Sequence, residues 1–344
     1  MKFAAGMGNV KVCETPEPNP GPGQVKLKVH AAGLCDTDLR IYRDELQVKP
    51  PVILGHEIAG EIIEVGQGIS ETLLNLRVTS QTRFQTSNSR RDHNDHSTNH
   101  NHGEISIDSE VNGGFAEYLV VPAQNLHRLP EHTSYREGAI TEPLARIVHS
   151  VLLTAPTVRA GDLAVIAGSG TVGLLTLQIL KASHATVIVL GTSEDSDRLA
   201  VAHDLGADYV VNIETRDIFA LVQDVSIQGL GADVVYECSG TPLMARHLLH
   251  LVRRYGRFVQ LERIGKHITW GLDEVCDKEL TVTGSNATTP ESWTRAIHLL
   301  ENQIIKMGPL ITHDFMLSEW KLAFDVFERR TGIKVLFRPH FDQA

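Results

Sequence analysis

A glycine pattern between an apolar strand and an apolar helix constrains this sequence more than any other feature. Residues 168–173 read G-S-G-T-V-G, a predicted buried strand over 162–167 precedes them, and an apolar helical pattern over 171–182 follows. In this context the first glycine allows a tight turn, the second lets the backbone approach a pyrophosphate, and the third permits close helix–strand packing. The helix N-terminus adds N–H donors and the positive end of a dipole. The pattern therefore predicts dinucleotide binding, rather than a plain structural turn, by Gly168, Ser169, Gly170, Thr171, Val172 and Gly173.

The pattern of apolar residues changes near residue 150. From about 151 onward, short apolar runs such as 186–190 and 233–237 alternate with helical patterns. This alternation is typical of βαβ units and a parallel sheet. Residues before 149 are instead rich in β patterns, with alternation over 25–30 and a β-branched run over 61–65. The fold class predicted is α/β, with a separate β-rich part.

The second strand of the predicted βαβ unit bears on the choice between NAD and NADP. An NAD site usually carries an Asp or Glu about 20 residues on, which bonds the adenosine ribose. Here the strand is followed by Thr192 and Ser193, without a carboxylate at its tip. These hydroxyls, with Arg198 one turn into the next helix, fit a 2′-phosphate, although Glu194 and Asp195 oppose it unless they point to solvent. The sequence favours NADP over NAD.

A second pattern lies upstream, where His56 and Glu57 stand side by side in an otherwise apolar run. Burying either group is costly unless it has a partner. His56 alone is equally well explained as a core histidine. Cys35 upstream and Glu142 downstream shift the balance, because thiolate, imidazole and carboxylate are the ligands of tetrahedral zinc. A catalytic zinc site keeps one position open for water or substrate.

Composition excludes several kinds of partner. The formal net charge of −10 argues against a nucleic-acid surface and against binding to anionic membranes. No signal-peptide pattern and no apolar run of roughly 18 residues is readable. The four cysteines show no disulfide spacing. These features predict a cytoplasmic protein with reduced thiols.

Together these residues resemble the zinc-dependent medium-chain dehydrogenases, in the branch with polyol (sorbitol-type) and threonine dehydrogenases. The resemblance covers nearly the whole chain and implies two domains. A GroES-like β-barrel catalytic domain would comprise residues 1–149 and 300–344, and a Rossmann domain would comprise 150–299. The resemblance rests on the glycine pattern and on the motifs at 33–38, 55–60, 112–118, 142–145, 205–208 and 309–313.

The resemblance also implies roles for individual residues. Cys35, His56 and Glu142 resemble zinc ligands, and Glu57 resembles a fourth, exchangeable ligand or a close neighbour of the metal. Zinc in such a site lowers the pKa of the substrate alcohol, and the carbinol carbon delivers hydride to the nicotinamide. Two further residues complete the implied catalytic set: Asp38, which would orient the histidine ligand, and Thr37, which would relay the substrate proton.

Two departures from the family pattern stand out. Many relatives hold a second, structural zinc through four clustered cysteines, but residues 79–111 contain no cysteine. One zinc per chain is therefore expected, and the four histidines at 93, 96, 100 and 102 are expected to lie in a solvated loop without metal, although such tracts can bind one. Arg146 is the second departure; it fits either an acidic substrate or a structural carboxylate.

The residues support three functional hypotheses. The leading one is a zinc- and NAD(P)-dependent dehydrogenase acting on a small polyol, sugar or other secondary alcohol, or in reverse on the ketone. The second is the same chemistry on L-threonine. The third is a catalytically idle nucleotide-binding relative, which the retained Cys35, His56 and Glu142 argue against. The strand-rich run 257–284, with 268–270 near a sheet edge, predicts a homo-oligomer, either a dimer or a tetramer.

Overall fold

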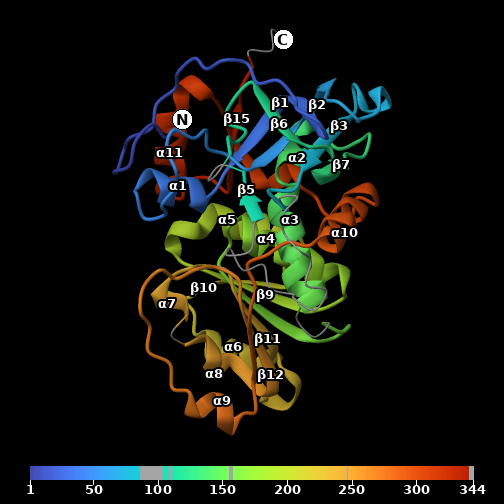
Figure 1. Ribbon diagram of the computed structural model, residues 1–344. Helices are drawn as coiled ribbons and strands as arrows, with labels where there is room; N and C mark the ends of the chain where they lie inside the picture. The colour runs from blue at the N-terminus through green and yellow to red at the C-terminus, as the bar shows by residue number, and fades with distance from the viewer. Residues whose placement is uncertain (86–103, 108–110, 155–157, 246, 341–344) are drawn as a thin grey trace. The chain divides into compact units, whose positions relative to one another are not determined.

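The computed structural model describes residues 1–85, 104–107, 111–154, 158–245 and 247–340 (Figure 1). Its contacts divide the chain into two compact units, Met1–Glu142 with Ile311–Ala344, and Pro143–Leu310. The domain limits expected from the sequence, 149 and 300, stay a prediction. Among the described residues, no helix combines the length and the apolar character needed to cross a membrane.

The first unit is built on a seven-stranded sheet in which strand β1 is central. β1 pairs antiparallel with β2, β6 and β15, so the C-terminal segment rejoins the sheet of the N-terminal segment. The pairing order is β14-β15-β1-β2-β3-β7, with β6 also on β1, and β4 and β5 form a separate ribbon. The strands are β1 (Gln24–Leu34), β2 (Glu57–Val65), β3 (Arg77–Ser80), β4 (Arg83–Gln85), β5 (Glu104–Ser106), β6 (Tyr118–Pro122), β7 (Leu126–Arg128), β14 (Ile311–Met316) and β15 (Lys334–Arg338).

The alternation in β1 explains this arrangement. Val25, Leu27 and Val29 are fully buried and pack against Ile58 and Ile62 of β2. One face of the sheet therefore forms the core of the unit, as the alternating pattern predicts. In this unit α2 (Tyr135–Ala139) lies against β1 and β2, and α11 (Trp320–Glu328) lies against β14 and β15. The unit also contains α1 (Asp36–Tyr42) and the start of α3 (Thr141–Val148).

The second unit is a six-stranded parallel sheet with the order β10-β9-β8-β11-β12-β13. Counted from the first strand of this unit, the order is 3-2-1-4-5-6, which is that of the doubly wound dinucleotide-binding fold. The expected α/β class with a Rossmann sheet is confirmed. Its strands are β8 (Leu163–Ala167), β9 (Thr186–Gly191), β10 (Tyr209–Asn212), β11 (Ala232–Glu237), β12 (Val252–Gln260) and β13 (Thr281–Gly284). Its helices are α4 (Thr171–Ala182), α5 (Ser196–Asp204), α6 (Ile218–Val225), α7 (Pro242–Ala245), α8 (Leu248–Leu251), α9 (Asp273–Asp277) and α10 (Pro290–Glu301).

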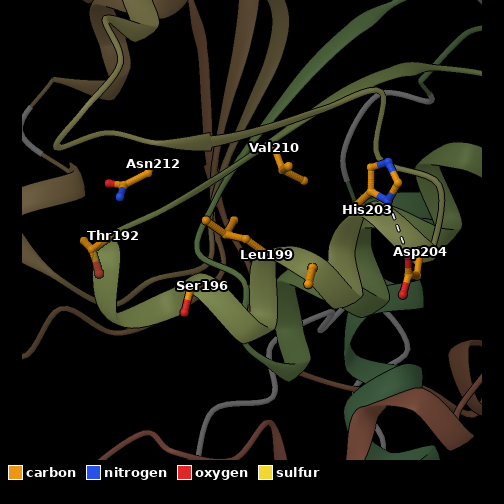
Figure 2. A pocket seen from close by; sticks show the side chains of 8 residues that line it. Thr192, Ser196, Leu199, His203, Asp204, Val210 and Asn212 are labelled. Atoms are coloured by element: carbon orange, nitrogen blue, oxygen red, sulfur yellow. Dashed lines mark hydrogen bonds and ion pairs between the residues drawn. The ribbon is translucent and has the colours of Figure 1, made fainter.

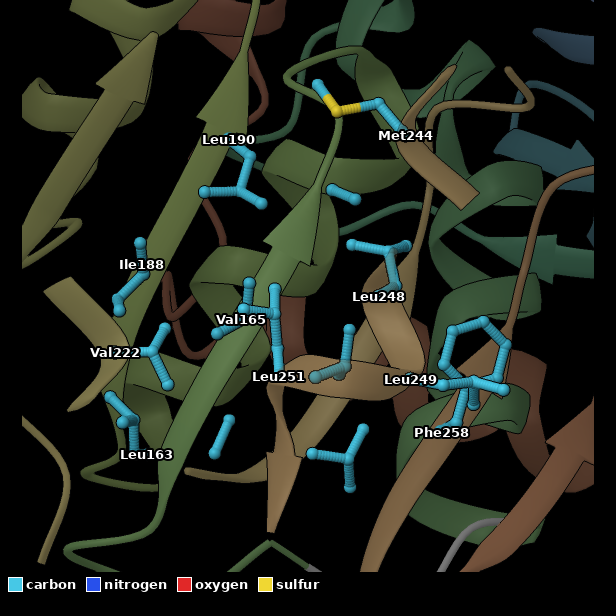
Figure 3. Close-up of a cluster of buried hydrophobic side chains, with 14 of the residues drawn as sticks. Leu163, Val165, Ile188, Leu190, Val222, Met244, Leu248, Leu249, Leu251 and Phe258 are labelled. Carbon is cyan, nitrogen blue, oxygen red and sulfur yellow. The ribbon is translucent and has the colours of Figure 1, made fainter. Parts of the chain in front are cut away.

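The core of this unit lies along the central strands. All five residues of β8 are buried, and Val165 belongs to one buried cluster with Ile188 of β9 and Phe258 of β12 (Figure 3). Continuous burial is expected of a parallel strand covered by helices on both faces. Each such aliphatic side chain contributes roughly 1.5–3 kcal/mol by leaving water. The packing fixes β8 beside β11, where the strand order reverses and dinucleotides bind.

One expectation about this sheet is wrong. Residues 268–270 form no strand, and the run 257–284 is extended only in β12 and β13. The reason is the indole of Trp270, which packs edge-on against Phe258 with ring centroids 4.9 Å apart and donates a hydrogen bond to the Ala245 carbonyl. The edge of the sheet is β13.

Candidate functional site

Three of the predicted metal ligands lie together in the first unit. The Sγ of Cys35 is 3.4 Å from Nε2 of His56, and one ligand atom of each of these two residues and of Glu57 lies within 4.8 Å of the others. Cys35 stands between β1 and α1, His56 directly precedes β2, and Glu57 begins that strand. Within the described ranges, this is the one group of three or more Cys, His, Asp or Glu residues close enough to hold a metal.

The pairing of β1 with β2 places Glu57 in this group. Gly33 of β1 lies opposite Glu57, and a Cβ on Gly33 would come within 2.0 Å of the Glu57 Oε2. Only glycine leaves room for the carboxylate to lie across the strand. Lys334 of β15 reaches the same space and donates to Glu57 Oε1 at 2.6 Å and to the Leu34 carbonyl at 3.0 Å. The two charged side chains are each only 3% exposed.

Asp38 joins the two segments that carry the donors. Its buried carboxylate accepts hydrogen bonds from the backbone N–H of Cys35 at 3.0 Å and of Gly55 at 3.2 Å. One side chain therefore fixes the backbone beside both ligand residues. Thr37 is half-buried in the first turn of α1, two residues from Cys35.

Glu142 lies outside the three-residue group. It is half-buried in the first turn of α3, and its negative charge helps to raise the pKa of Glu57. The structure thus gathers three of the four predicted ligands and brings the fourth within electrostatic reach of them. Of the predicted set, only Glu142 would have to move toward the others to share one ion.

The electrostatics of the group fit a divalent cation. Burial raises the pKa of the Cys35 thiol to about 12, and the negative charge of Asp38 adds to the effect. Burial also raises the pKa of Glu57, with Glu142 acting in the same sense and Lys334 opposing it. Carboxylates thus outnumber ammonium groups around a buried thiol. A zinc ion would take the place of the thiol proton and compensate this charge.

The predicted dinucleotide loop has the geometry that the glycine pattern requires. Gly168 has φ +110°, and a Cβ on it would come within 2.8 Å of the Ser239 backbone. A Cβ on Gly170 would meet nothing within 4 Å, which leaves space for a phosphate. A Cβ on Gly173 would come within 2.0 Å of the Gly168 carbonyl oxygen, so the helix packs tightly on the loop. Thr171 and Val172 form the first turn of α4, and Ser169 is buried in the loop.

The groups expected to receive a 2′-phosphate already have partners. Asp195 accepts hydrogen bonds from the Thr192 N–H and hydroxyl, each at 3.0 Å, and lies 3.4 Å from the Arg198 guanidinium. The Ser193 N–H donates to a carboxylate oxygen of Glu214 at 2.9 Å. The donors at the tip of β9 therefore face two carboxylates.

Arg146 also has a carboxylate partner. Its Nη2 contacts Oε1 of Glu262, and both side chains are mostly buried. Of the two interpretations that the sequence allowed, a structural carboxylate is the one that the structure provides. The four histidines at 93, 96, 100 and 102 lie outside the described residues.

Sequence reasoning missed two residues of these sites. Lys334 was detectable as a lone charge in the apolar run 333–337, which is unusual for a buried strand. Glu214 follows β10 at the carboxyl edge of the sheet, where ligands of parallel sheets bind. Its partner Ser193 is 21 residues away, so only the strand order shows that they meet.

Comparison with known proteins gives two family matches. The family described as "Alcohol dehydrogenase GroES-like domain" matches residues 21–131, and "Zinc-binding dehydrogenase" matches residues 171–302. The first match covers strands β1 to β7 with the candidate metal-ligand group, and the second covers α4 and strands β9 to β13 of the parallel sheet.

Full-length relatives are also found. The chain is 36% identical to sorbitol dehydrogenase of Halalkalibacterium halodurans, over 98% of each chain. It is 32% identical to L-threonine 3-dehydrogenase of Thermococcus kodakarensis, over 96% of this chain and 95% of the relative. The crystal structure of 2R,3R-butanediol dehydrogenase from Bacillus subtilis matches with a TM-score of 0.86 and 26% identity, over 98% of each chain.

Proposed function

Because this chain belongs to the zinc-dependent medium-chain alcohol and polyol dehydrogenases, we propose that its physiological substrate is a secondary alcohol of a polyol or sugar. The protein is an oxidoreductase that transfers a hydride between an alcohol and a nicotinamide dinucleotide. The observation that carries the proposal is the group formed by Cys35, His56 and Glu57 within 4.8 Å of one another. An idle nucleotide-binding protein has no chemical need for such a group.

Particular residues would hold the metal. Cys35 and His56 would supply a thiolate and an imidazole, and Glu142, which lies within electrostatic reach of Glu57, would supply the third ligand. Glu57 would be the exchangeable fourth ligand, because Lys334 pairs with its carboxylate when no metal is bound to it. When bound, zinc supplies a Lewis acid that acidifies the alcohol, and the nicotinamide supplies the hydride acceptor.

The remaining work falls to side chains of this chain. The Thr37 hydroxyl, half-buried two residues from Cys35, takes the proton that the alcohol loses and passes it toward solvent. Asp38 holds Cys35 and Gly55 through their backbone N–H groups and so keeps the ligands in place. The residues Gly168, Ser169, Gly170, Thr171, Val172 and Gly173 bind the pyrophosphate.

The number of zinc ions per chain is inferred from the cysteine content, and the choice between NAD and NADP from the sequence and from contacts at the tip of β9. We expect one zinc per chain, because residues 79–111 lack the cysteines of a structural site. The sequence favours NADP, whereas the contacts of Thr192 and Ser193 with carboxylates favour NAD. The free state of all four cysteines agrees with the cytoplasmic location expected from the sequence.

A metal assay and a substrate panel test the proposal. We expect one tightly bound zinc per purified chain and oxidation of polyols or sugars in preference to L-threonine. Oxidation of threonine in preference to every polyol would favour the second hypothesis, which the similarity to L-threonine 3-dehydrogenase of Thermococcus kodakarensis supports. Dinucleotide binding without zinc and without turnover would favour the idle relative.

The edge strand β13 supports the expectation of a homo-oligomer. Thr281 and Val282 of β13 are exposed, and the backbone on the outer side of this strand ends the sheet. A second copy of β13 can add to this edge and continue the sheet. Light scattering that gave only the 37.9 kDa species would contradict this part of the proposal.

A further inference from the structure

The residues after β9 and β10 form one polar surface at the carboxyl edge of the parallel sheet. β10 pairs parallel with β9 so that Asn212 lies opposite Gly191, and Ile213 N–H donates to the Gly191 carbonyl at 3.0 Å. In a doubly wound fold the adenosine ribose lies at the end of the second strand, which here is β9. The residues after β10 are therefore neighbours of the ribose position.

Glu214 reaches from this neighbouring strand to the tip of β9. Its Oε2 accepts a hydrogen bond from Ser193 N–H at 2.9 Å, and the Asn212 amide donates to Ser193 Oγ at 3.0 Å. Bonds from Ser193 lower the pKa of Glu214, which keeps the carboxylate ionised. An ionised carboxylate offers about four acceptor sites, so Glu214 can also accept from a ribose hydroxyl.

Arg198, the cation beside the tip of β9, already has a carboxylate partner and so is not available to a 2′-phosphate. Arg198 lies 3.4 Å from Asp195, which also accepts from Thr192. A hollow of about 400 Å³ opens beside Thr192 and Asn212, between α5 and β10, and its described lining contains no Lys or Arg (Figure 2). A 2′-phosphate at the tip of β9 would lie beside Asp195 and Glu214, which bond the Thr192 and Ser193 donors, and Arg198 already contacts Asp195.

Building on the proposed dehydrogenase function, we propose that Glu214 and Asp195 select NAD and reject NADP. Glu214 supplies from β10 the ribose-binding carboxylate that the tip of β9 lacks, and both carboxylates repel a 2′-phosphate. The expectation of NADP drawn from Thr192, Ser193 and Arg198 is thereby reversed. The sequence shows these donors and Asp195, but not that Asp195 bonds Thr192 or that Glu214 reaches Ser193.

Calorimetric titration of the zinc-loaded protein with NAD and with NADP, without alcohol, tests the proposal directly. We expect NAD to bind at least about tenfold more tightly than NADP, since like charges brought together cost more than about 1.4 kcal/mol. Glu214→Gln and Asp195→Asn each keep the shape and an acceptor oxygen while removing the charge. Each should strengthen NADP binding about tenfold, and Glu214→Gln should also weaken NAD binding.

The matched control is Glu194→Gln, which removes an exposed charge one residue from Ser193 and should leave both affinities unchanged. Tighter binding of NADP than NAD by the natural protein would overturn the proposal, as would an equal response of all three variants. Polyol oxidation that ran best with NADP would overturn it while leaving the proposed function intact. NAD binding in preference to NADP, without turnover on any alcohol, would support the cofactor selection and contradict the proposed function. Binding of neither cofactor would contradict both proposals.

Discussion

At the scale of single residues, Glu57 depends on a partner far along the chain. Its carboxylate and the Lys334 ammonium are each 3% exposed, and water contributes little to either charge. A buried ion pair adds little net stability, but removing one partner leaves the other charge buried and uncompensated, which destabilises the fold. We therefore expect the loss of one member of the pair to lower the free energy of unfolding more than the loss of both members together.

Lys334→Met should leave the buried Glu57 carboxylate without its ion-pair partner. We expect a loss of about 3–5 kcal/mol in the free energy of unfolding, measured by urea denaturation of the metal-free protein. The double variant Lys334→Met with Glu57→Gln removes both charges and should recover most of this loss. Equal instability of the single and double variants would show that the lysine acts by packing alone.

Cys35→Ser should abolish tight zinc binding. A serine hydroxyl is a far weaker zinc ligand than a thiolate, so zinc content should fall to background and alcohol oxidation by more than about 100-fold. Atomic emission on dialysed protein and a steady-state assay measure the two effects. Cys13→Ser, which changes an exposed cysteine outside the ligand group, is the matched control and should keep both.

His127 should make stability depend on pH. Burial lowers its pKa from 6.5 to about 4, and its Nε2 lies 2.8 Å from the Gln81 amide nitrogen, which donates to the neutral ring. The unfolded chain therefore binds more protons between these values, and stability falls as the pH drops below about 6.5. The loss is below about 3 kcal/mol, because the ring is partly exposed and solvent screens the charge.

Comparison with His127→Gln isolates this effect from other titrating groups. The difference in unfolding free energy between the two proteins should be constant above about pH 7 and should shift against the natural protein as the pH falls from 6.5 to about 4. A difference that stayed flat across this range would show that the imidazole titrates normally.

At the scale of elements, the local sequence pattern predicted those helices and strands whose formation depends on neighbouring residues in the sequence. The helix expected over 171–182 is α4, because a glycine loop starts it and an apolar run carries it across the sheet. The strand-rich run expected over 257–284 begins earlier, at Val252 of β12, and residues 268–270 within it form no strand. There the Trp270 side chain packs inward, and a tertiary contact overrides strand propensity.

The site shows the same division. Cys35, His56 and Glu57 were readable because their side-chain types are diagnostic of metal binding. The contacts of Lys334 and Glu214 with these sites were not readable, because each residue meets its site only through strand pairing across the sheet. Ligand identity is a local property, whereas charge compensation depends on sheet order.

The edge strand β13 carries the prediction at this scale. Val282 is 42% exposed on a strand whose outer edge ends the sheet. Val282→Glu places a charge where two copies would pair, and like charges across a two-fold axis repel. We expect a shift from oligomer to a species near 37.9 kDa in light scattering, with the unfolding midpoint of the isolated chain little changed. Ser193→Glu, in the same unit but away from the edge, should leave the mass unchanged.

At the scale of the whole molecule, the two units carry different parts of the chemistry. The ligand group and its lysine lie within Met1–Glu142 and Ile311–Ala344, and the glycine loop lies within Pro143–Leu310. Each bound group should therefore stabilise the unit that holds it.

Hydrogen exchange can follow the two effects separately. Removal of zinc by a chelator should raise exchange in β1, β2 and β15, because the Glu57 and Cys35 backbone loses its cross-link. NAD at about 100 times its dissociation constant should slow exchange in β8, β9 and α4, corresponding to about 2.7 kcal/mol. Uniform changes over all strands would show instead that the units unfold as one.

The return of β15 to β1 has a consequence for synthesis of the chain. Ala32, Gly33 and Leu34 find their partners Phe337, Leu336 and Val335 only at the far end of the sequence. While the ribosome is still at work, the nascent polypeptide holds a thiol, an imidazole and a carboxylate with no ammonium beside them and an open strand edge along β1. Maturation of the metal-binding half must therefore wait for the final strand to emerge.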